Sequence, residues 1–265
     1  MTLPRIGLGT FRLEGSQAIA SVSAALEIGY RLIDTAQMYN NETEVGKAIA
    51  ASGIPRSEIF ITTKIWPDNF VRLIPSLHES LARLRIDQVE LTLLHWPAPG
   101  SGIPLADTLG ALMQAKAAGL TQHIGVSNFN IALMREAIAI AGPGNIATNQ
   151  IELSPYLQNR KVAAFAKSQG IQLTSYMTLA RGKVMSDATL KKIAQRLGAT
   201  PAQVALAWAM NAGHTVIPSS TRRENIESNF RATELQLSNA DIDVIAALES
   251  NGRLVDPDGL KPAWD

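Results

Sequence analysis

The chain has 265 residues, of which 46% are hydrophobic and 18% charged, a balance typical of a globular protein and unlike that of a disordered or fibrous one. Its formal net charge of +1 gives no overall field to attract nucleic acid or an anionic membrane, and the lack of cysteine excludes disulfides, thiolate catalysis and Cys-ligated metal centres. With no apolar run of the roughly 18 residues that a membrane span needs, and no signal-peptide core at the start, we expect a cytoplasmic protein.

Short β-rich runs bounded by turn residues alternate along the chain with stretches of helical spacing. The predicted strands cover residues 6–11, 31–36, 58–66, 89–96, 123–127, 146–153, 171–177 and 214–220. The predicted helices cover residues 17–28, 42–51, 74–84, 106–118, 131–139, 160–168, 190–197, 202–210 and 239–248, and one more is expected after the eighth strand. Thr200 is the expected N-cap of the helix at 202–210, with Pro201 at its first position.

Eight strand–helix units in about 250 residues predict a closed (β/α)₈ barrel, the TIM barrel of the α/β class. The alternative is an open doubly wound sheet, which usually carries G-x-G-x-x-G after its first strand. Here the segment that starts at Gly7 and Gly9 has Arg12 in place of the third glycine, which favours the barrel. Because no linker or low-complexity tract divides the chain, we expect one domain over residues 1–265.

Polar residues stand late in the predicted strands, where a barrel of this kind places its catalytic groups. They are Asp34, Lys64, His95, Ser127, Asn128, Gln150, Glu152 and Tyr176. The other histidines lie elsewhere: His123 and His214 open their strands and His78 lies in a helix. Of the four histidines, only His95 is therefore placed for chemistry.

Asp34 and Lys64 on neighbouring strands must pair if both are buried, because an isolated buried charge is costly. Tyr39 follows on the loop after Asp34, within reach of the same mouth. An ammonium beside a phenol favours the phenolate, so we expect Lys64 to lower the pKa of Tyr39 toward working pH. A neutral His95 would orient a carbonyl, which leaves the phenol to deliver a proton.

Several motifs resemble those of the aldo-keto reductases. The signature runs from Gly29 through Asp34, Tyr39 and Glu42 to Gly46, and it is followed in order by Thr63-Lys64, Leu94-His95-Trp96-Pro97, Gly125-Val126-Ser127-Asn128-Phe129 and Asn149-Gln150-Ile151-Glu152. The resemblance covers almost the whole chain. It is strongest to short bacterial members of the 2,5-diketo-D-gluconate reductase B type, which also reduce methylglyoxal and other small aldehydes.

The resemblance implies roles for individual residues. Tyr39 would be the general acid, Lys64 the group that lowers its pKa, Asp34 the partner of Lys64, and His95 the group that orients the carbonyl. It also implies an apolar substrate wall, formed by Phe11, Trp66 and Trp96 together with Tyr39 and His95.

The resemblance further implies a nicotinamide site. Ser127, Asn128 and Gln150 would bind the carboxamide, and Tyr176 would stack on the nicotinamide ring. Other cofactor contacts would come from the backbone of Gly9, Thr10 and Leu179, from Asp34, and from Asn229 at the adenine.

The match is weakest after the eighth predicted strand, where many relatives have Lys in place of Ser219, Arg in place of Asn225 and Glu in place of Ser228. The hydroxyls of Ser220 and Thr221, a helix N-terminus and Arg222 still form a reasonable phosphate site beside Ser219. We therefore expect NADPH in preference to NADH, and no metal.

Two other functions remain compatible with these residues. A lysine at the end of a barrel strand is also the nucleophile of Schiff-base aldolases, which would give Lys64 a covalent role. The same fold would also serve a non-catalytic subunit that binds NADP(H).

Individual residues also have purely structural interpretations. Asp34 and Lys64 would form a salt bridge without a catalytic role, Ser127 would cap a helix, and Trp66 and Trp96 would pack in the barrel. The favoured interpretation is a monomeric NADPH-dependent reductase of aldehydes and ketones.

Overall fold

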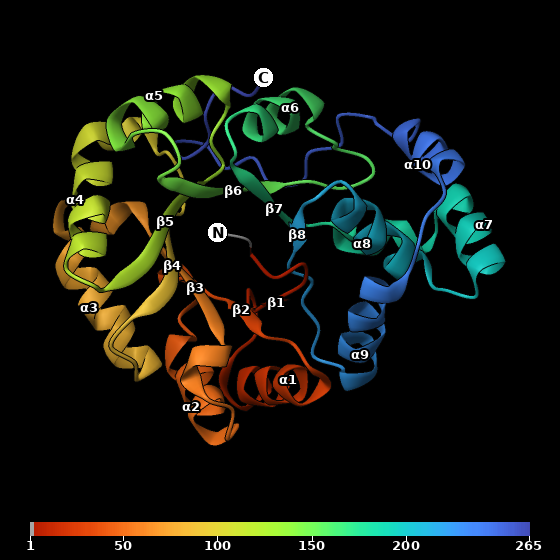
Figure 1. The fold of residues 1–265 in the computed structure, drawn as a ribbon, viewed down its shortest axis with the longest axis horizontal. Coiled ribbons are helices and arrows are strands. Elements are labelled where there is room, and N and C mark those ends of the chain that lie inside the picture. The colour runs from red at the N-terminus through yellow and green to blue at the C-terminus, as the bar shows by residue number, and fades with distance from the viewer. Residues whose placement is uncertain (1–2) are drawn as a thin grey trace.

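Eight parallel strands form a ring at the centre of the molecule, and helices surround it (Figure 1). The computed structural model describes residues 3–265. The strands are β1 (Leu8–Gly9), β2 (Leu32–Asp34), β3 (Phe60–Ile65), β4 (Val89–Leu94), β5 (Thr121–Ser127), β6 (Ile146–Glu152), β7 (Gln172–Tyr176) and β8 (Thr215–Val216). They lie in the order in which they occur in the chain.

The ring closes between its first and last segments. A parallel bridge joins Ile6 to Val216, the Gly7 N–H donates to the Val216 carbonyl at 2.8 Å, and the Gly9 N–H donates to the Pro218 carbonyl at 3.1 Å. These contacts make the sheet a closed barrel, so the predicted (β/α)₈ fold is confirmed.

The helices follow the predicted positions, with ends that differ by a few residues. They are α1 (Gly15–Ile28), α2 (Glu42–Ala51), α3 (Leu73–Leu84), α4 (Leu105–Ala117), α5 (Ile131–Ala141), α6 (Arg160–Ser168), α7 (Ala188–Leu197), α8 (Pro201–Asn211), α9 (Arg223–Arg231) and α10 (Asn239–Ala246). The expected cap of α8 is present, since the Thr200 hydroxyl accepts from the Gln203 N–H and the Gln203 side chain accepts from the Thr200 N–H.

Two local predictions differ from the structure. The first and eighth predicted strands shrink to two residues each, because the chain turns away after Gly9 and after Val216 to build the rim. Ser127 does not cap the next helix. Asn130 caps α5 by accepting from the Leu133 N–H, and the Ser127 hydroxyl points inward to the Gln150 carbonyl.

The helices pack closely on one another where small residues allow it. Gly46 of α2 lies against the end of α3, and a Cβ at this position would stand 2.5 Å from the Leu84 carbonyl oxygen and 2.8 Å from that of Arg83. Only glycine fits this contact, which sets the distance between α2 and α3 and hence the position of the β2–α2 loop.

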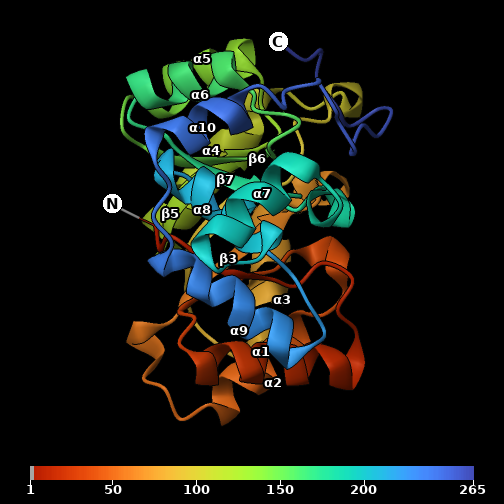
Figure 2. The same ribbon diagram turned by 90° about the vertical axis from the view of Figure 1, so that its right-hand side faces the viewer.

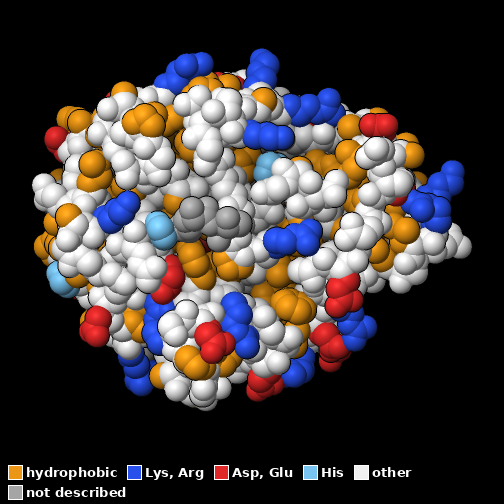
Figure 3. Space-filling view, viewed as in Figure 1, with side chains coloured by type: hydrophobic (Ala, Val, Ile, Leu, Met, Phe, Trp, Pro, Cys, Tyr) orange, Lys and Arg blue, Asp and Glu red, His pale blue; other side chains and the backbone are white. Residues whose placement is uncertain are grey.

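The two ends of the barrel differ in how they are covered. At the N-terminal ends of the strands, Leu3 packs on Leu91 and Leu93 inside the ring. Figure 2 places the C-terminal segment at the opposite end, across the carboxyl ends of the strands. Figure 3 shows the face that carries the N-terminus, where basic and acidic side chains are interspersed around the rim. Within residues 3–265, no helix is long and apolar enough to cross a membrane.

Candidate active site

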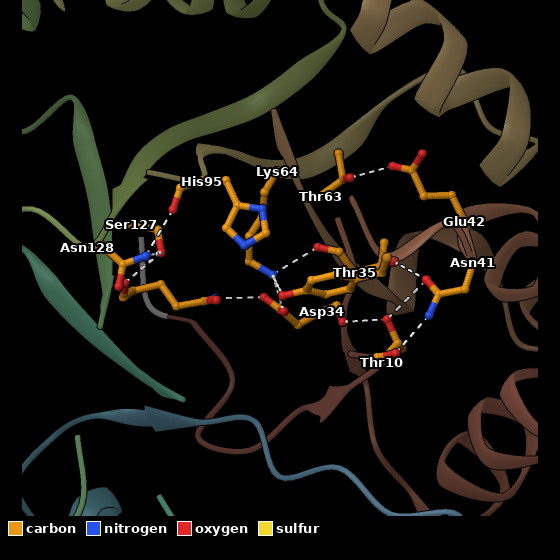
Figure 4. A network of polar contacts seen from close by, with 12 residues as sticks. Thr10, Asp34, Thr35, Asn41, Glu42, Thr63, Lys64, His95, Ser127 and Asn128 are labelled. Carbon is orange, nitrogen blue, oxygen red and sulfur yellow. Dashed lines mark hydrogen bonds and ion pairs between the residues drawn. The ribbon is translucent and has the colours of Figure 1, made fainter. Parts of the chain in front are cut away.

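Lys64 stands at the centre of the polar groups at the carboxyl ends of the strands. Its side chain leaves β3 one residue before the strand ends and is fully buried. The ammonium donates to Asp34 Oδ1, to the Thr35 carbonyl at 3.0 Å and to the Tyr39 hydroxyl at 3.2 Å. Figure 4 shows Lys64 aimed at Asp34 and Thr35 on the neighbouring strand. All three N–H donors therefore have acceptors.

Asp34 is held from two sides. Its second oxygen, Oδ2, accepts from Gln150 Nε2 at 2.7 Å, across the barrel from β6. Burial alone lowers the pKa of Lys64, but the charge of Asp34, together with Tyr39 and hydrogen bonds to both, raises that pKa above its ordinary value. Lys64 is therefore an ammonium at neutral pH.

Tyr39 lies in a short 3₁₀ helix, η1 (Gln37–Tyr39), which a buried glutamine fixes in place. Gln37 donates to the Ser76 carbonyl at 3.1 Å and accepts from the Trp66 N–H at 3.0 Å. It also contacts Ser80 and Asn69 through its two ends. The turn that carries the phenol is thus tied to both α3 and the end of β3.

The pKa of Tyr39 differs from the sequence-based prediction. Burial raises the pKa of the phenol most strongly, and the charge of Asp34 raises it further, whereas the charge and hydrogen bond of Lys64 lower it. The net pKa of Tyr39 lies above the ordinary value. The prediction that Lys64 lowers this pKa toward working pH is wrong for the net shift, because it left out desolvation. The phenol is consequently protonated at neutral pH, as a proton donor must be.

A second polar cluster fixes the loops after β1 and β2. Asn41, buried at the start of α2, donates to the Thr10 carbonyl at 2.7 Å and to the Leu13 carbonyl at 2.9 Å, and accepts from the Thr35 hydroxyl at 2.8 Å. Figure 4 shows Asn41 between Thr10 and Thr35. The Asn41 side chain thereby holds the loop that carries Phe11 against the loop that carries Tyr39.

Glu42, the next residue, supports β3 from outside the barrel. Its buried carboxylate accepts from the Thr63 hydroxyl at 2.6 Å and from Arg83 Nε at 2.8 Å. Thr63 precedes Lys64, so the two neighbouring side chains point to opposite sides of the strand. Sequence reasoning quoted Glu42 in the family signature without a role and missed Asn41 and Gln37. Their position next to Tyr39 was the signal that could have found them.

His95 follows β4 directly and is 7% exposed. Burial, and then the charge of Lys64, hold the pKa of His95 well below its ordinary value, so the imidazole is neutral. Its ring centroid lies 5.6 Å from that of Tyr39 and 5.2 Å from that of Trp66, both edge-on. A neutral imidazole keeps one N–H to donate to a carbonyl oxygen in this cavity.

The residues expected to hold a nicotinamide line one side of the same cavity. Asn128 donates to the His95 carbonyl at 3.0 Å and to the Ser127 hydroxyl at 3.1 Å, and its Oδ1 accepts from the Tyr176 hydroxyl at 2.6 Å. Figure 4 shows Ser127, Asn128 and His95 in this arrangement. Asn128 has a left-handed backbone at φ 65°, which turns its side chain back across the strand ends. It therefore orients the Tyr176 ring along the cavity wall.

The cavity fits a planar, amide-bearing ring. Its polar wall of Ser127, Asn128 and Gln150 offers the amide and hydroxyl groups that a carboxamide pairs with. Gly9 and Ile217 also line the cavity, and their backbones pack so closely that a Cβ on residue 9 would stand 2.6 Å from the Ile217 carbonyl oxygen. The lining continues to Ser219 after β8. The residues present thus fit a nicotinamide ring, whose carboxamide Ser127, Asn128 and Gln150 would hold.

After β8, Ile217 and Pro218 are buried, Ser220 is half-buried, and Ser219, Thr221 and Arg222 are exposed. The Arg222 N–H donates to the Ser220 hydroxyl at 3.1 Å, and Arg222 is the N-cap residue of α9. The Arg222 guanidinium lies 3.6 Å from Glu224, but both side chains are more than 70% exposed. Thr221 is exposed beside them, and Asn229 is buried on the inner face of α9.

The rest of the cavity lining is largely apolar. Phe11, Tyr39, His95 and Trp96 line it as expected, together with four residues that sequence reasoning missed: Met38, Met177, Ile217 and Val255. Three other predicted residues do not line the cavity. Trp66 contacts His95, Thr10 is fully buried, and Leu179 packs on the core.

Comparison with known proteins agrees with the barrel fold. The model of the aldo/keto reductase family matches residues 5–250. The chain belongs to the aldo/keto reductase family. It is 60% identical over 267 residues to the methylglyoxal reductase DkgB of Salmonella typhimurium and 57% identical to that of Yersinia pestis, with 100% of each chain covered.

Solved structures of the aldo/keto reductase family superpose closely on the chain. A crystal structure assigned as a 2,5-diketo-D-gluconic acid reductase B has a TM-score of 0.96 and 43% identity, and the match covers 99% of this chain and 94% of that one. The aldose reductase of Schistosoma japonicum has a TM-score of 0.90 and 31% identity, with 96% and 91% covered. The chain is accordingly an oxidoreductase of the aldo-keto reductase type. Among residues 3–265, no group of three or more His, Asp or Glu could hold a metal ion.

Proposed function

We propose that the protein is an NADPH-dependent reductase of small aldehydes and ketones, such as methylglyoxal and 2,5-diketo-D-gluconate, in which Tyr39 protonates the carbonyl oxygen. We further propose that it is a single-domain, cytoplasmic monomer. The observation that carries the reaction is the Asp34–Lys64–Tyr39 chain, in which Asp34 and Lys64 are buried and Tyr39 lines the same cavity as the neutral His95.

The four residues divide the work of proton transfer. His95 orients the carbonyl by donating a hydrogen bond to its oxygen, and Tyr39 gives its proton to the same oxygen. When bound, the nicotinamide supplies the hydride that reduces the carbonyl carbon. Phe11 packs on Tyr39, with ring centroids 5.1 Å apart, and helps to keep water from the phenol.

Lys64 acts on the charge that remains after the proton has left. The phenolate of Tyr39 would be costly at a buried site, but the ammonium 3.2 Å away stabilises it. Asp34 keeps Lys64 charged and in place, and Gln150 fixes Asp34. Lys64 therefore assists the transfer step although burial raises the resting pKa of Tyr39.

The state of Lys64 favours reduction over Schiff-base chemistry. A nucleophilic lysine needs a lowered pKa and a free lone pair, whereas Lys64 has a raised pKa and three acceptors. Trapping of substrate on Lys64 by borohydride, with no nicotinamide requirement, would refute the reductase. Binding of NADPH without reduction of any aldehyde would instead favour a non-catalytic subunit.

The preference for NADPH rests on Arg222 and the hydroxyls of Ser220 and Thr221 at the start of α9. An exposed guanidinium at a helix N-terminus suits a phosphate, which would displace Glu224 as its partner. We expect Arg222→Ala to weaken NADPH binding about tenfold and to leave NADH binding nearly unchanged, as measured by nicotinamide fluorescence. The proposal fails if the two cofactors give similar kcat/KM values in the wild type.

The decisive experiment is Tyr39→Phe. This substitution removes the proton donor but keeps the ring in the cavity, so we expect unchanged NADPH affinity and a loss of about 10²–10⁴ in kcat for methylglyoxal. Methylglyoxal, 2,5-diketo-D-gluconate, 4-nitrobenzaldehyde and simple sugars form the substrate panel. Reduction at a near wild-type rate by Tyr39→Phe would exclude the proposed acid.

A further inference from the structure

The C-terminal segment crosses the mouth of the barrel. We call residues 251–265 the C-terminal strap. Its far end is fixed to the loops after β4 and β5, because the Ala98 N–H donates to the Leu260 carbonyl at 3.2 Å and Asn130 donates to the Ala263 carbonyl at 2.7 Å. Its near end is fixed by the Gly252 N–H, which donates to the Tyr156 carbonyl at 2.9 Å. Figure 2 shows this segment across the end of the barrel.

The middle of the C-terminal strap is held by one side chain of the barrel. Glu152, the last residue of β6, is 1% exposed. Its Oε1 accepts from the Leu254 N–H at 2.8 Å and its Oε2 accepts from the Val255 N–H at 2.9 Å. Each oxygen thus takes one of two consecutive backbone donors. Sequence analysis placed Glu152 at this mouth, but the proposed reaction gives it no role.

Glu152 has no ionic partner within the described residues 3–265, where none of the ion pairs includes it. Burial raises the pKa of this carboxyl, while the two strap N–H groups and the more distant charges of Arg253 and Arg181 lower it, with a net rise. A buried carboxylate without a cation in contact is costly unless hydrogen bonds satisfy it. The two strap N–H groups therefore supply the hydrogen bonds that the buried carboxylate needs, and the carboxylate in turn holds the strap in place.

This anchor lies beside the reaction cavity. Val255, whose N–H reaches Glu152, lines the cavity together with Tyr39, His95 and Tyr176. Glu152 is also the register partner of Tyr176 on β7. The anchor thus connects the substrate side of the cavity with the wall that carries Tyr176.

We propose that Glu152 is a positioning residue for the substrate: its carboxylate holds residues 254 and 255 of the C-terminal strap in the position that completes the carbonyl-binding side of the cavity. The proposal rests on the proposed reductase function for its kinetic consequence. Its structural consequence, the protection of two backbone amides, does not depend on any activity.

The test is Glu152→Gln. The carboxamide keeps the shape but has a single acceptor oxygen, so its NH₂ faces one of the strap N–H donors. We expect the amides of Leu254 and Val255 to exchange with solvent deuterium at least tenfold faster than in the wild type. We also expect KM for methylglyoxal to rise about tenfold, with kcat changed less than about threefold and NADPH affinity unchanged.

Glu249→Gln is the matched control. Glu249 also accepts from two backbone amides, those of Gln158 at 2.6 Å and Asn251 at 2.7 Å, but it is exposed and does not line the cavity. We expect this variant to keep the KM of the wild type and the protection of Leu254 and Val255. An equal rise in KM in both variants would overturn the proposal, since it would show a general loosening of the C-terminal segment.

If Glu152→Gln does not fold, Val255→Pro makes the same test from the strap, because proline removes the N–H that reaches Oε2 and leaves the barrel unchanged. We then expect faster exchange at Leu254 and a rise in KM beyond that of Val255→Ala, which loses the same cavity-lining side chain but keeps its N–H and should keep Leu254 protected. Unchanged exchange and unchanged KM in Glu152→Gln or Val255→Pro would refute the proposal. A loss of kcat and of NADPH affinity in Glu152→Gln, with the amides of Leu254 and Val255 still protected from exchange, would also refute the proposal, because Glu152 would then act through Tyr176. Absence of any reductase activity in the wild type, with the exchange results as expected, would refute only the proposed function.

Discussion

Lys64→Met leaves the carboxylate of Asp34 buried in the barrel without a cation. Asp34 is 2% exposed and would keep only the hydrogen bond from Gln150 as a strong contact at Oδ2. Removing one partner of a buried pair costs about 3–5 kcal/mol, most of which is the penalty of the charge left behind. We expect a loss of about 4 kcal/mol in the free energy of unfolding.

The double variant Asp34→Asn/Lys64→Met separates folding from chemistry. It removes both charges together, so no buried ion lacks a partner, and replacing a buried pair by neutral groups is often nearly neutral. We expect it to be within about 2 kcal/mol of the wild type, which makes it more stable than Lys64→Met. The reductase activity should stay lost in both variants, because Lys64 is absent from each.

Urea unfolding at pH 7, followed by circular dichroism, measures the three stabilities, and NADPH consumption with methylglyoxal measures the activity. The reasoning would be refuted by a double variant that is less stable than Lys64→Met, because the loss of the second charge would then bring no relief and the pair would not be coupled. A restored activity in the double variant would refute the role of Lys64 beside Tyr39.

The pair also sets an alkaline limit. The pKa of Lys64 is raised in the folded state, so its contribution to stability is complete below the ordinary lysine pKa of about 10.4 and is lost as the pH rises through the folded-state value. The stability difference between the wild type and the double variant should therefore be constant from pH 6 to pH 9. A change in that difference within this range would contradict the assignment.

Three further outcomes follow from burial and packing. His95 should stay neutral from pH 6 to pH 8, because burial and then Lys64 lower its pKa, so its imidazole signals in NMR should show no titration midpoint near 6.5. Burial lowers the pKa of His214 to about 4, so the unfolded chain takes up this proton first, and stability should fall as the pH drops from about 6.5 toward 4. His214→Gln should reduce that fall in urea titrations, and an unchanged acid profile would exclude His214 as a cause. Gly46→Ala should lower the unfolding free energy by about 1–3 kcal/mol because its Cβ meets backbone, whereas Gly110→Ala on α4 has open space and should raise it by about 0.5–1 kcal/mol. Equal effects of the two glycine substitutions in thermal melts would argue against the packing between α2 and α3.

The alternation of strands and helices was sufficient to predict the barrel, because each unit carries its own periodicity and turn residues. The lengths of β1 and β8 were overestimated: the predicted runs continue to Phe11 and Ser220, whereas the strands end at Gly9 and Val216. An apolar pattern reports burial rather than strand pairing, and Ile217 and Pro218 are buried in the rim although they lie outside β8.

Three of the four proposed catalytic residues, Asp34, Lys64 and His95, stand at or directly after strand ends, which sequence can locate. The sequence could not predict the balance of burial and charge that sets the pKa of Tyr39, where desolvation exceeds the effect of Lys64. The contacts of Glu152 with residues 254 and 255 were also out of reach, since they join positions 102 and 103 residues apart that share no pattern. Gln37 and Asn41 were missed because, in the sequence, a buried amide near Tyr39 looks like any polar loop residue.

The closure between Ile6 and Val216 has a consequence for how the polypeptide is made. Its two halves lie 210 positions apart, so during synthesis the opening segment emerges long before its neighbour exists. Until the last strand leaves the ribosome, residue 6 has no partner for this bridge, and an unpaired strand edge is a site of mispairing. Completion of the ring is then a late, long-range event, and a slow phase in refolding would be expected at this seam.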